Sequence, residues 1–117
     1  MTNYLNNVND TIGLIITSYT SIAKCISIIR KYNAISIGEI RKLIENSKFI
    51  FEVDYTSHSG VRKLSKCYDE LAKNGIECEI IVLGEPENRE FLSNLMGSHR
   101  QTEIEVQAQI DQEVGED

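Results

Sequence analysis

Residues 22–45, IAKCISIIRKYNAISIGEIRKLIE, decide the fold, because they contain two apolar stripes at helical spacing with a short polar turn between them. Residues three or four positions apart lie on one face of an α-helix. The first stripe consists of Ile22, Ile26, Ile29 and Tyr32, and the second of Ile37, Ile40, Leu43 and Ile44. We therefore predict two amphipathic helices whose apolar faces pack on a common core.

The polar residues between the stripes mark the start of the second helix. Ser36 stands three residues before Glu39, which is the spacing of a capping box. In that motif the serine side chain accepts a hydrogen bond from the backbone amide of the glutamate, and the glutamate side chain accepts one from the backbone amide of the serine. The sequence thus predicts a turn at residues 33–35 and a helix that begins directly after Ser36.

Three other segments, residues 11–19, 48–55 and 76–82, alternate apolar and polar residues, as strands with one buried face do. The residues expected on their buried faces are Ile12, Leu14 and Ile16, then Phe49, Phe51, Val53 and Tyr55, and finally Ile76, Cys78, Ile80 and Val82. Helical spacing returns from Val61 to Leu71, and Gly75 marks the end of that helix.

The order of these elements predicts an α+β domain of two layers. In this βααβαβ fold, three helices pack on one face of a small three-stranded sheet. We place the domain at residues 11–84, after a loose, Asn-rich lead-in at residues 1–10. The whole chain of 117 residues is long enough for one such domain to bury a core without staples.

An acidic C-terminal extension occupies residues 85–117. Pro86 suits the first position of a helix, so a short helix is expected at about 86–96, ending at Gly97. Beyond it, the alternation of Ile104, Val106, Ala108 and Ile110 favours a strand, whereas the spacing of Val106, Ile110 and Val114 favours a helix. We predict a strand, and an acidic segment of this kind can also stay disordered until a partner orders it.

Charge is distributed unevenly along the chain. Residues 1–84 hold 10 Lys and Arg against 9 Asp and Glu, whereas residues 85–117 hold 2 against 9. Binding to nucleic acid needs clustered cations, so we expect no binding to nucleic acid. A positively charged protein partner is a better match to the acidic extension. Residues 1–10 contain no Lys or Arg for a signal peptide, and the apolar runs are short, so we expect a cytoplasmic protein without a membrane span.

No motif of catalysis or metal binding stands out. Cys25, Cys67 and Cys78 lack the close pairing of a zinc or redox site and are expected to be reduced and buried. His58 lies between two serines at a predicted strand-to-helix loop, where helix capping accounts for the serines. We therefore predict no catalytic residues, no metal ligands and no cofactor, and we expect the protein not to be an enzyme.

The helix pair resembles the C-terminal domain of the bacterial ribosomal stalk protein. That family has roughly V-I-K-A-V-R, a Gly-rich turn, and L-K-E-A-K-x-L-V-E, and the corresponding letters here are CISIIR at 25–30 and IGEIRKLIE at 37–45. The similarity resumes at Gly60-Val61 and continues through LAKNG at 71–75 into the strand at 76–82, so that it covers residues 11–83. The fold is shared, loosely, with the adaptor of the Clp protease.

The resemblance implies a docking surface on the first two helices, which the stalk family uses to bind translation factors. The matching residues are Arg30, Ile37, Glu39 and Arg41. Ile22, Ser27 and Gly38 stand where the family has lysines, and Ala34 and Ser36 replace turn glycines. Residues 1–10 also lack the Ala-rich hinge of the stalk protein, so we interpret this chain as a stand-alone relative in fold and not the ribosomal protein itself.

Two other surfaces could bind a partner. One is the acidic tail, with Glu103, Glu105, Asp111 and Glu113. The other is the open face of the sheet, where Glu52, Asp54, Glu77 and Glu79 are expected beside Ile15, Ile50 and Ile81, although an ordinary solvated face has the same pattern.

A small acidic domain without a recognisable catalytic motif suggests a cytoplasmic immunity protein that neutralises a bacterial toxin, whose basic cleft would attract carboxylates. The alternative is a stalk-like module that binds a translation factor or serves as a protease adaptor through its first two helices. We expect a monomer or a weak homo-oligomer, and a homo-oligomer whose tails exchange strands is a third possibility.

Overall fold

The structure is a computed structural model that describes residues 10–101 of the chain. Its elements are β1 (Thr11–Ser18), α2 (Ile22–Ile29), α3 (Ile37–Glu45), β2 (Phe49–Asp54), α4 (His58–Lys73), β3 (Glu77–Val82), β4 (Glu85–Glu87) and a last helix over residues 89–101. The predicted α+β fold is confirmed, and the first six elements follow the predicted order.

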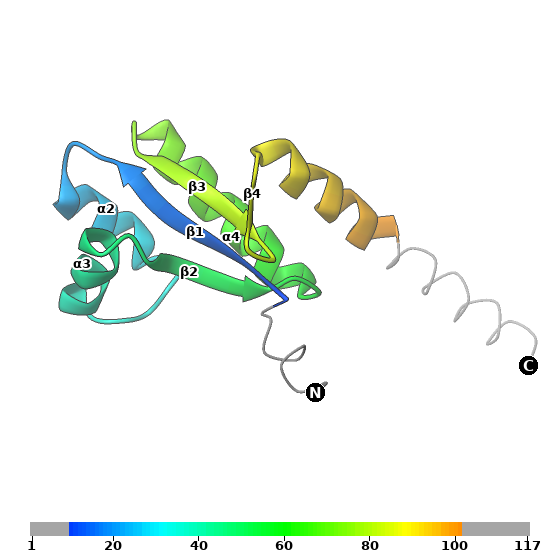
Figure 1. The fold of residues 1–117 in the computed structure, drawn as a ribbon, viewed down its shortest axis with the longest axis horizontal. Helices are drawn as coiled ribbons and strands as arrows, with labels where there is room; N and C mark the ends of the chain where they lie inside the picture. The colour runs from blue at the N-terminus through cyan, green and yellow to red at the C-terminus, as the bar shows by residue number, and fades with distance from the viewer. Residues whose placement is uncertain (1–9, 102–117) are drawn as a thin grey trace, which may run out of the picture.

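The strands form one antiparallel sheet in the order β2-β1-β3-β4. Figure 1 shows α4 running along one face of this sheet, behind β1 and β3, and α2 packs against both α3 and α4. The apolar faces of the helices and of the sheet meet in a single core, with Ile12, Leu14 and Leu64 fully buried. The other face of the sheet carries no helix of the described residues.

Serine side chains begin three of the helices. Ser21 caps α2, Ser36 caps α3 and Ser57 caps α4. Each serine hydroxyl oxygen accepts a hydrogen bond from the backbone amide three residues further on, at 3.2, 3.1 and 3.0 Å respectively. Of the two hydrogen bonds expected in the capping box, the structure contains the one that Ser36 accepts from the amide of Glu39. At the other end of α4, Gly75 has a φ of 78° and ends the helix as predicted.

The sheet has a fourth strand that the sequence reading did not include. Leu83 and Gly84 have φ of 52° and 85° and form a two-residue turn, after which β4 returns along β3. Pro86 lies in this edge strand, opposite Ile81, and not at the start of a helix. An edge strand tolerates proline because only one side of its backbone has to form ladder hydrogen bonds. The last helix accordingly begins at residue 89, and it continues past Gly97 to residue 101.

A β-bulge in β2 corrects the predicted alternation. Leu14 pairs with Phe51 and Ile15 with Phe49, so Ile50 is an extra residue without a partner in the ladder. The extra residue reverses the faces of the residues before it. Ile50 is therefore fully buried in the core, and Phe49 lies on the open face, where its ring covers Gly13. The predictions that Phe49 is a core residue and that Ile50 lies on the open face were wrong.

The last helix belongs to the same core. Leu92 is fully buried and Leu95 nearly so, and both pack in the cluster formed by the sheet and the other helices. The ring of Phe91 lies 6.4 Å from that of Tyr55, between ring centroids. Arg89 donates two hydrogen bonds to the carboxylate of Asp69, at 2.8 and 2.9 Å, and so ties this helix to α4.

Candidate protein-binding surfaces

The open sheet face combines an apolar strip with carboxylates. Across β1, Glu52 and Ile81 lie on either side of Gly13, and Glu79 lies opposite Ile15. The strip consists of Phe49, Ile15, Ile81 and Pro86, and the exposed acidic residues are Glu52, Asp54, Glu77 and Glu79. The structure therefore brings together the four acidic residues predicted for this face, and Phe49 takes the place predicted for Ile50.

Charge is divided between the two layers of the molecule. The four strands contain six Asp and Glu residues and no Lys or Arg. Helices α2, α3 and α4 contain seven Lys and Arg residues against four Asp and Glu. The sheet layer is thus acidic and the helical layer basic.

Two of the carboxylates on the sheet face are held by hydrogen bonds. The hydroxyl of Thr11 donates to Glu52 at 2.6 Å. The hydroxyl and the amide of Thr56 donate to Asp54 at 2.7 and 2.8 Å, and these bonds lower the pKa of the Asp54 carboxyl. Hydrogen bonds to a carboxylate favour its charged form, so Asp54 stays ionised well below neutral pH.

A groove between α2 and α3 gathers three of the four residues that the stalk resemblance implies. It has a volume of about 450 Å³ and is lined by Ala23, Ile26, Ser27, Arg30, Ile37 and Arg41. The side chain of Ile37 is 50% exposed, so the prediction that it packs in the core with the rest of its stripe was wrong. Glu39 is exposed and lies outside the lining of the groove.

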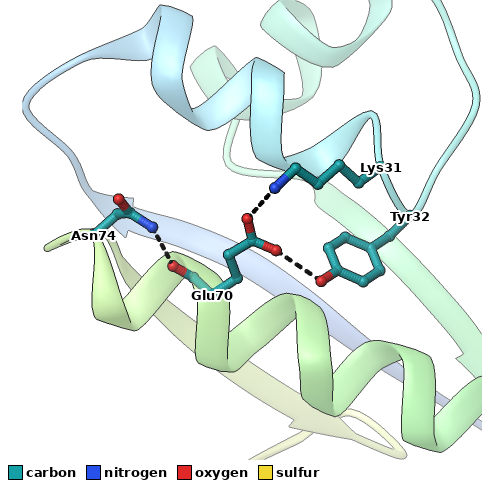
Figure 2. Close-up of polar contacts among 4 residues, drawn as sticks. All are labelled: Lys31, Tyr32, Glu70 and Asn74. Atoms are coloured by element: carbon teal, nitrogen blue, oxygen red, sulfur yellow. Dashed lines mark hydrogen bonds and ion pairs between the residues drawn. The ribbon is translucent and has the colours of Figure 1, made fainter.

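A hydrogen-bonded junction fixes the end of α2 against α4 (Figure 2). The carboxylate of Glu70 accepts from the ammonium group of Lys31 and, at 2.7 Å, from the hydroxyl of Tyr32. The side-chain amide of Asn74 donates a hydrogen bond to the backbone carbonyl of Glu70 at 2.7 Å. The bond to Glu70 raises the pKa of Tyr32 to about 12, while Lys31 and Tyr32 lower that of Glu70. Because Arg30 directly precedes Lys31, this junction also holds the end of the groove in place.

The α2–α3 connection is tied to the bulge in β2. Asn33, in the turn that follows α2, donates from its side-chain amide to the backbone carbonyl of Ile50 at 3.0 Å. This bond satisfies the backbone carbonyl of the bulged residue. The turn at residues 33–35 and the bulge therefore support one another.

The three cysteine thiols are buried or partly buried, and their pKa values are raised. Cys25 and Cys67 are fully buried, and Cys78 is partly buried. Burial raises the pKa of the Cys67 and Cys78 thiols to about 12 and also raises that of Cys25. These thiols are therefore protonated at neutral pH.

Two further observations concern only residues 10–101. No three His, Cys, Asp or Glu side chains among them come together in a way that could hold a metal ion. None of their helices combines the length and the apolar character that crossing a membrane requires.

The imidazole ring of His58, the first residue of α4, stacks on that of His99 with 4.0 Å between centroids, which joins α4 to the last helix.

The acidic tail lies outside the described residues. The predictions for Glu103, Glu105, Asp111 and Glu113, and the choice between strand and helix for residues 102–114, therefore stay predictions.

Comparisons with protein-family models, with curated proteins and with solved structures gave no match. The resemblance to the ribosomal stalk domain accordingly stays an interpretation of the sequence.

Sequence reasoning missed Phe49 as a residue of the open sheet face, and it missed Pro86 as the residue opposite Ile81 on that face. A signal for Phe49 was present in Gly13, the one glycine in the first predicted strand, because glycine in a strand often marks a bulge or a close approach. A weaker signal for Pro86 was present in Gly84, because glycine suits the positive φ that a two-residue hairpin turn requires.

Proposed function

We propose that this protein is a non-enzymatic inhibitor that binds a basic protein partner through its open sheet face. The supporting observation is that Glu52, Asp54, Glu77 and Glu79 surround an apolar strip on a sheet layer without cations. We further propose that it acts as a cytoplasmic immunity protein and that the partner is a bacterial toxin, for example a nuclease with a basic cleft.

The arrangement matches the anatomy of a protein interface. Stable interfaces have an apolar centre, which is desolvated on binding, and a polar rim. Phe49, Ile15 and Ile81 are partly exposed and can form such a centre, since the described helices pack on the opposite face. The surrounding carboxylates would attract a cationic partner over about 8 Å at physiological salt and would disfavour acidic proteins.

The decisive residues are Glu77 and Glu79, because both are exposed and neither side-chain carboxylate forms a hydrogen bond or ion pair within residues 10–101. The double variant Glu77→Gln/Glu79→Gln removes two charges from the face with little change in shape. We expect the wild-type protein, immobilised and exposed to a lysate of its native host, to retain one basic polypeptide that mass spectrometry identifies. The variant should retain much less of it.

A matched control is Glu45→Gln/Glu90→Gln, which removes the same charge from two exposed helical positions. This control should bind as the wild type does. Purified partner would then be assayed for toxicity and for nuclease activity, with and without the protein. Equal loss of binding in both double variants would mean that only net charge matters, and an unaffected Glu77→Gln/Glu79→Gln variant would refute the sheet face as the binding surface.

A second candidate function uses the groove between α2 and α3. It is favoured because the half-exposed Ile37 and two cations, Arg30 and Arg41, line one hollow. Such a groove fits an apolar segment flanked by carboxylates, as a translation factor or a protease partner could present. This function would make the protein a stalk-like docking module or an adaptor.

The two candidates are separated by reversing charges in the groove. Arg30→Glu/Arg41→Glu should abolish capture of an elongation factor or a protease and leave the fold intact, because both side chains are exposed. The matched control is Lys42→Glu/Lys48→Glu, which reverses two exposed cations outside the groove. If the Arg30→Glu/Arg41→Glu variant binds every partner as the wild type does, the groove is not a docking site.

A further inference from the structure

The outer edge of β2 offers backbone groups to another strand. Tyr55 donates its amide to the carbonyl of Asp10, which continues the register of β1 and β2, so alternate residues of β2 direct their backbone towards β1. Glu52 and Asp54 therefore direct their backbone N–H and C=O groups away from the sheet. Within residues 10–101, Ser57 bonds the carbonyl of Asp54, which leaves the N–H and C=O of Glu52 and the N–H of Asp54 available.

A groove runs beside this edge on the helical side of the sheet. It has a volume of about 470 Å³ and lies between β2 and the first half of α4. Its lining consists of Phe51, Val53, Ser59, Gly60, Arg62, Lys63 and Lys66. The strand thus supplies apolar side chains, and the helix supplies three exposed cations, Arg62, Lys63 and Lys66.

The first turn of α4 packs closely against β2 beside this groove. A Cβ on Gly60 would lie 3.1 Å from the Cβ of Val53 and 2.8 Å from the hydroxyl of Ser57, so the absence of a side chain at Gly60 lets α4 begin close to β2. The helix then carries Lys63 and Lys66 along the strand. An open backbone edge and a cationic, apolar groove consequently lie side by side.

We propose that β2 is a docking edge for an extended acidic segment of a partner protein, which adds to the sheet as a further strand. The assignment goes beyond the proposed inhibitor function, because it concerns a different surface and a partner segment of the opposite charge. Charge complementarity with Lys63 and Lys66 selects the occupant, since the four strands themselves contain no cation.

The geometry of a strand specifies the pattern of that segment. Successive side chains of an added strand point to opposite faces of the sheet. Every second side chain would enter the groove, where Glu or Asp would meet Lys63 and Lys66 above the apolar floor of Phe51 and Val53. The side chains between them would lie on the open face beside Glu52, where carboxylates are disfavoured, so these positions call for apolar or basic residues. Backbone hydrogen bonds would supply affinity, and the alternation would supply specificity.

The test uses the full chain, labelled with ¹⁵N, and a synthetic peptide, acetyl-Thr-Glu-Val-Glu-Val-Glu-Thr-amide. We expect the peptide to shift the amide resonances of Glu52 and Asp54 and to slow their hydrogen exchange, because both amides become hydrogen-bonded. The matched peptide with Lys in place of each Glu should bind about tenfold more weakly or not at all. A Glu peptide methylated at the alternate backbone nitrogens that face β2 should also fail to bind, because these nitrogens can no longer donate hydrogen bonds to the edge.

Two protein variants complete the test. Lys63→Glu/Lys66→Glu should weaken the Glu peptide about tenfold. Lys24→Glu/Lys42→Glu, the same charge change on α2 and α3, should leave its affinity unchanged, and circular dichroism would check that both variants fold. Binding that survives Lys63→Glu/Lys66→Glu, or peptide shifts confined to other surfaces, would overturn the proposal.

Exchange in the free protein distinguishes the other possible occupants. If the amides of Glu52 and Asp54 already exchange slowly without peptide, the edge is occupied by the protein itself and the assignment to a partner is wrong. Protection that grows with protein concentration would identify a second copy, and protection independent of concentration would identify a segment of the same chain.

Discussion

Adding a single methyl group at Gly13 tests the bulge that shapes the sheet face. A Cβ at this position would lie 2.4 Å from Cδ1 of Phe49 and 2.6 Å from Cε1. Carbon atoms in contact prefer about 3.5–4.0 Å, so in Gly13→Ala the ring has to move by about 1 Å or more. Gly13 is not one of the residues with a positive φ, so alanine suits the backbone and the cost is steric. Overpacking of this kind costs about 1–3 kcal/mol, which urea unfolding followed by circular dichroism would measure.

A double-mutant cycle isolates the contact with Phe49. In a Phe49→Ala background the ring is absent, so we expect Gly13→Ala to cost less than about 0.5 kcal/mol there, with a coupling energy of about 1 kcal/mol or more. If Gly13→Ala costs the same in both backgrounds, Phe49 does not cover Gly13. The bulge and the position of Phe49 on the open face would then both be wrong.

Three further predictions follow from the same packing and hydrogen bonding. Ile50→Ala should lower the free energy of unfolding by about 2–5 kcal/mol because Ile50 is fully buried, whereas Ile81→Ala on the open face should cost less than about 1 kcal/mol; equal costs in urea unfolding would contradict the bulge. Tyr32 should ionise near pH 12 in an absorbance titration, and at lower pH in the Glu70→Gln variant; an unchanged titration would refute the hydrogen bond. Because the pKa of Tyr32 is raised in the folded protein, its contribution to stability is complete below the pKa of an unfolded tyrosine. That contribution is lost as pH rises through about 12. Cys67 should react with iodoacetamide at pH 8 far more slowly in the native than in the urea-unfolded protein, as mass spectrometry would report, and equal rates would contradict its burial.

Much of the fold could be predicted from the sequence because local patterns and packing agree there. The stripe of Ile22, Ile26 and Ile29 is amphipathic, and Ser36 provides a cap at the right spacing, so both helices form where expected. The bulge at Ile50 could not be predicted in the same way. Alternation assigns faces only while the register is regular, and a single extra residue reverses the assignment without changing the composition.

The C-terminal part was predicted less well, for a physical reason that Pro86 illustrates. Proline with a φ near −65° suits the first turn of a helix and an edge strand equally, so its local preference does not choose between them. The hairpin at Leu83 and Gly84 decides the matter, because it pairs the following residues with β3. Leucine is uncommon at positive φ, and this concealed the turn.

The binding surfaces divide along similar lines. The carboxylates of Glu77 and Glu79 were assigned to the correct face, because β3 has no bulge between them. The groove at the edge of β2 was not predicted, because it depends on how closely α4 approaches the strand at Gly60, and no single-element pattern carries that information.

The salt dependence of binding tests the central claim most directly, which is that the carboxylates of the open sheet face attract a basic partner. The measurement is the affinity of the captured partner for the wild type and for Glu77→Gln/Glu79→Gln between low and high salt. If the claim is right, the affinity of the wild type falls steeply as salt screens the charges, and the variant is weaker at low salt and less sensitive to salt. Identical curves for the two proteins would contradict it.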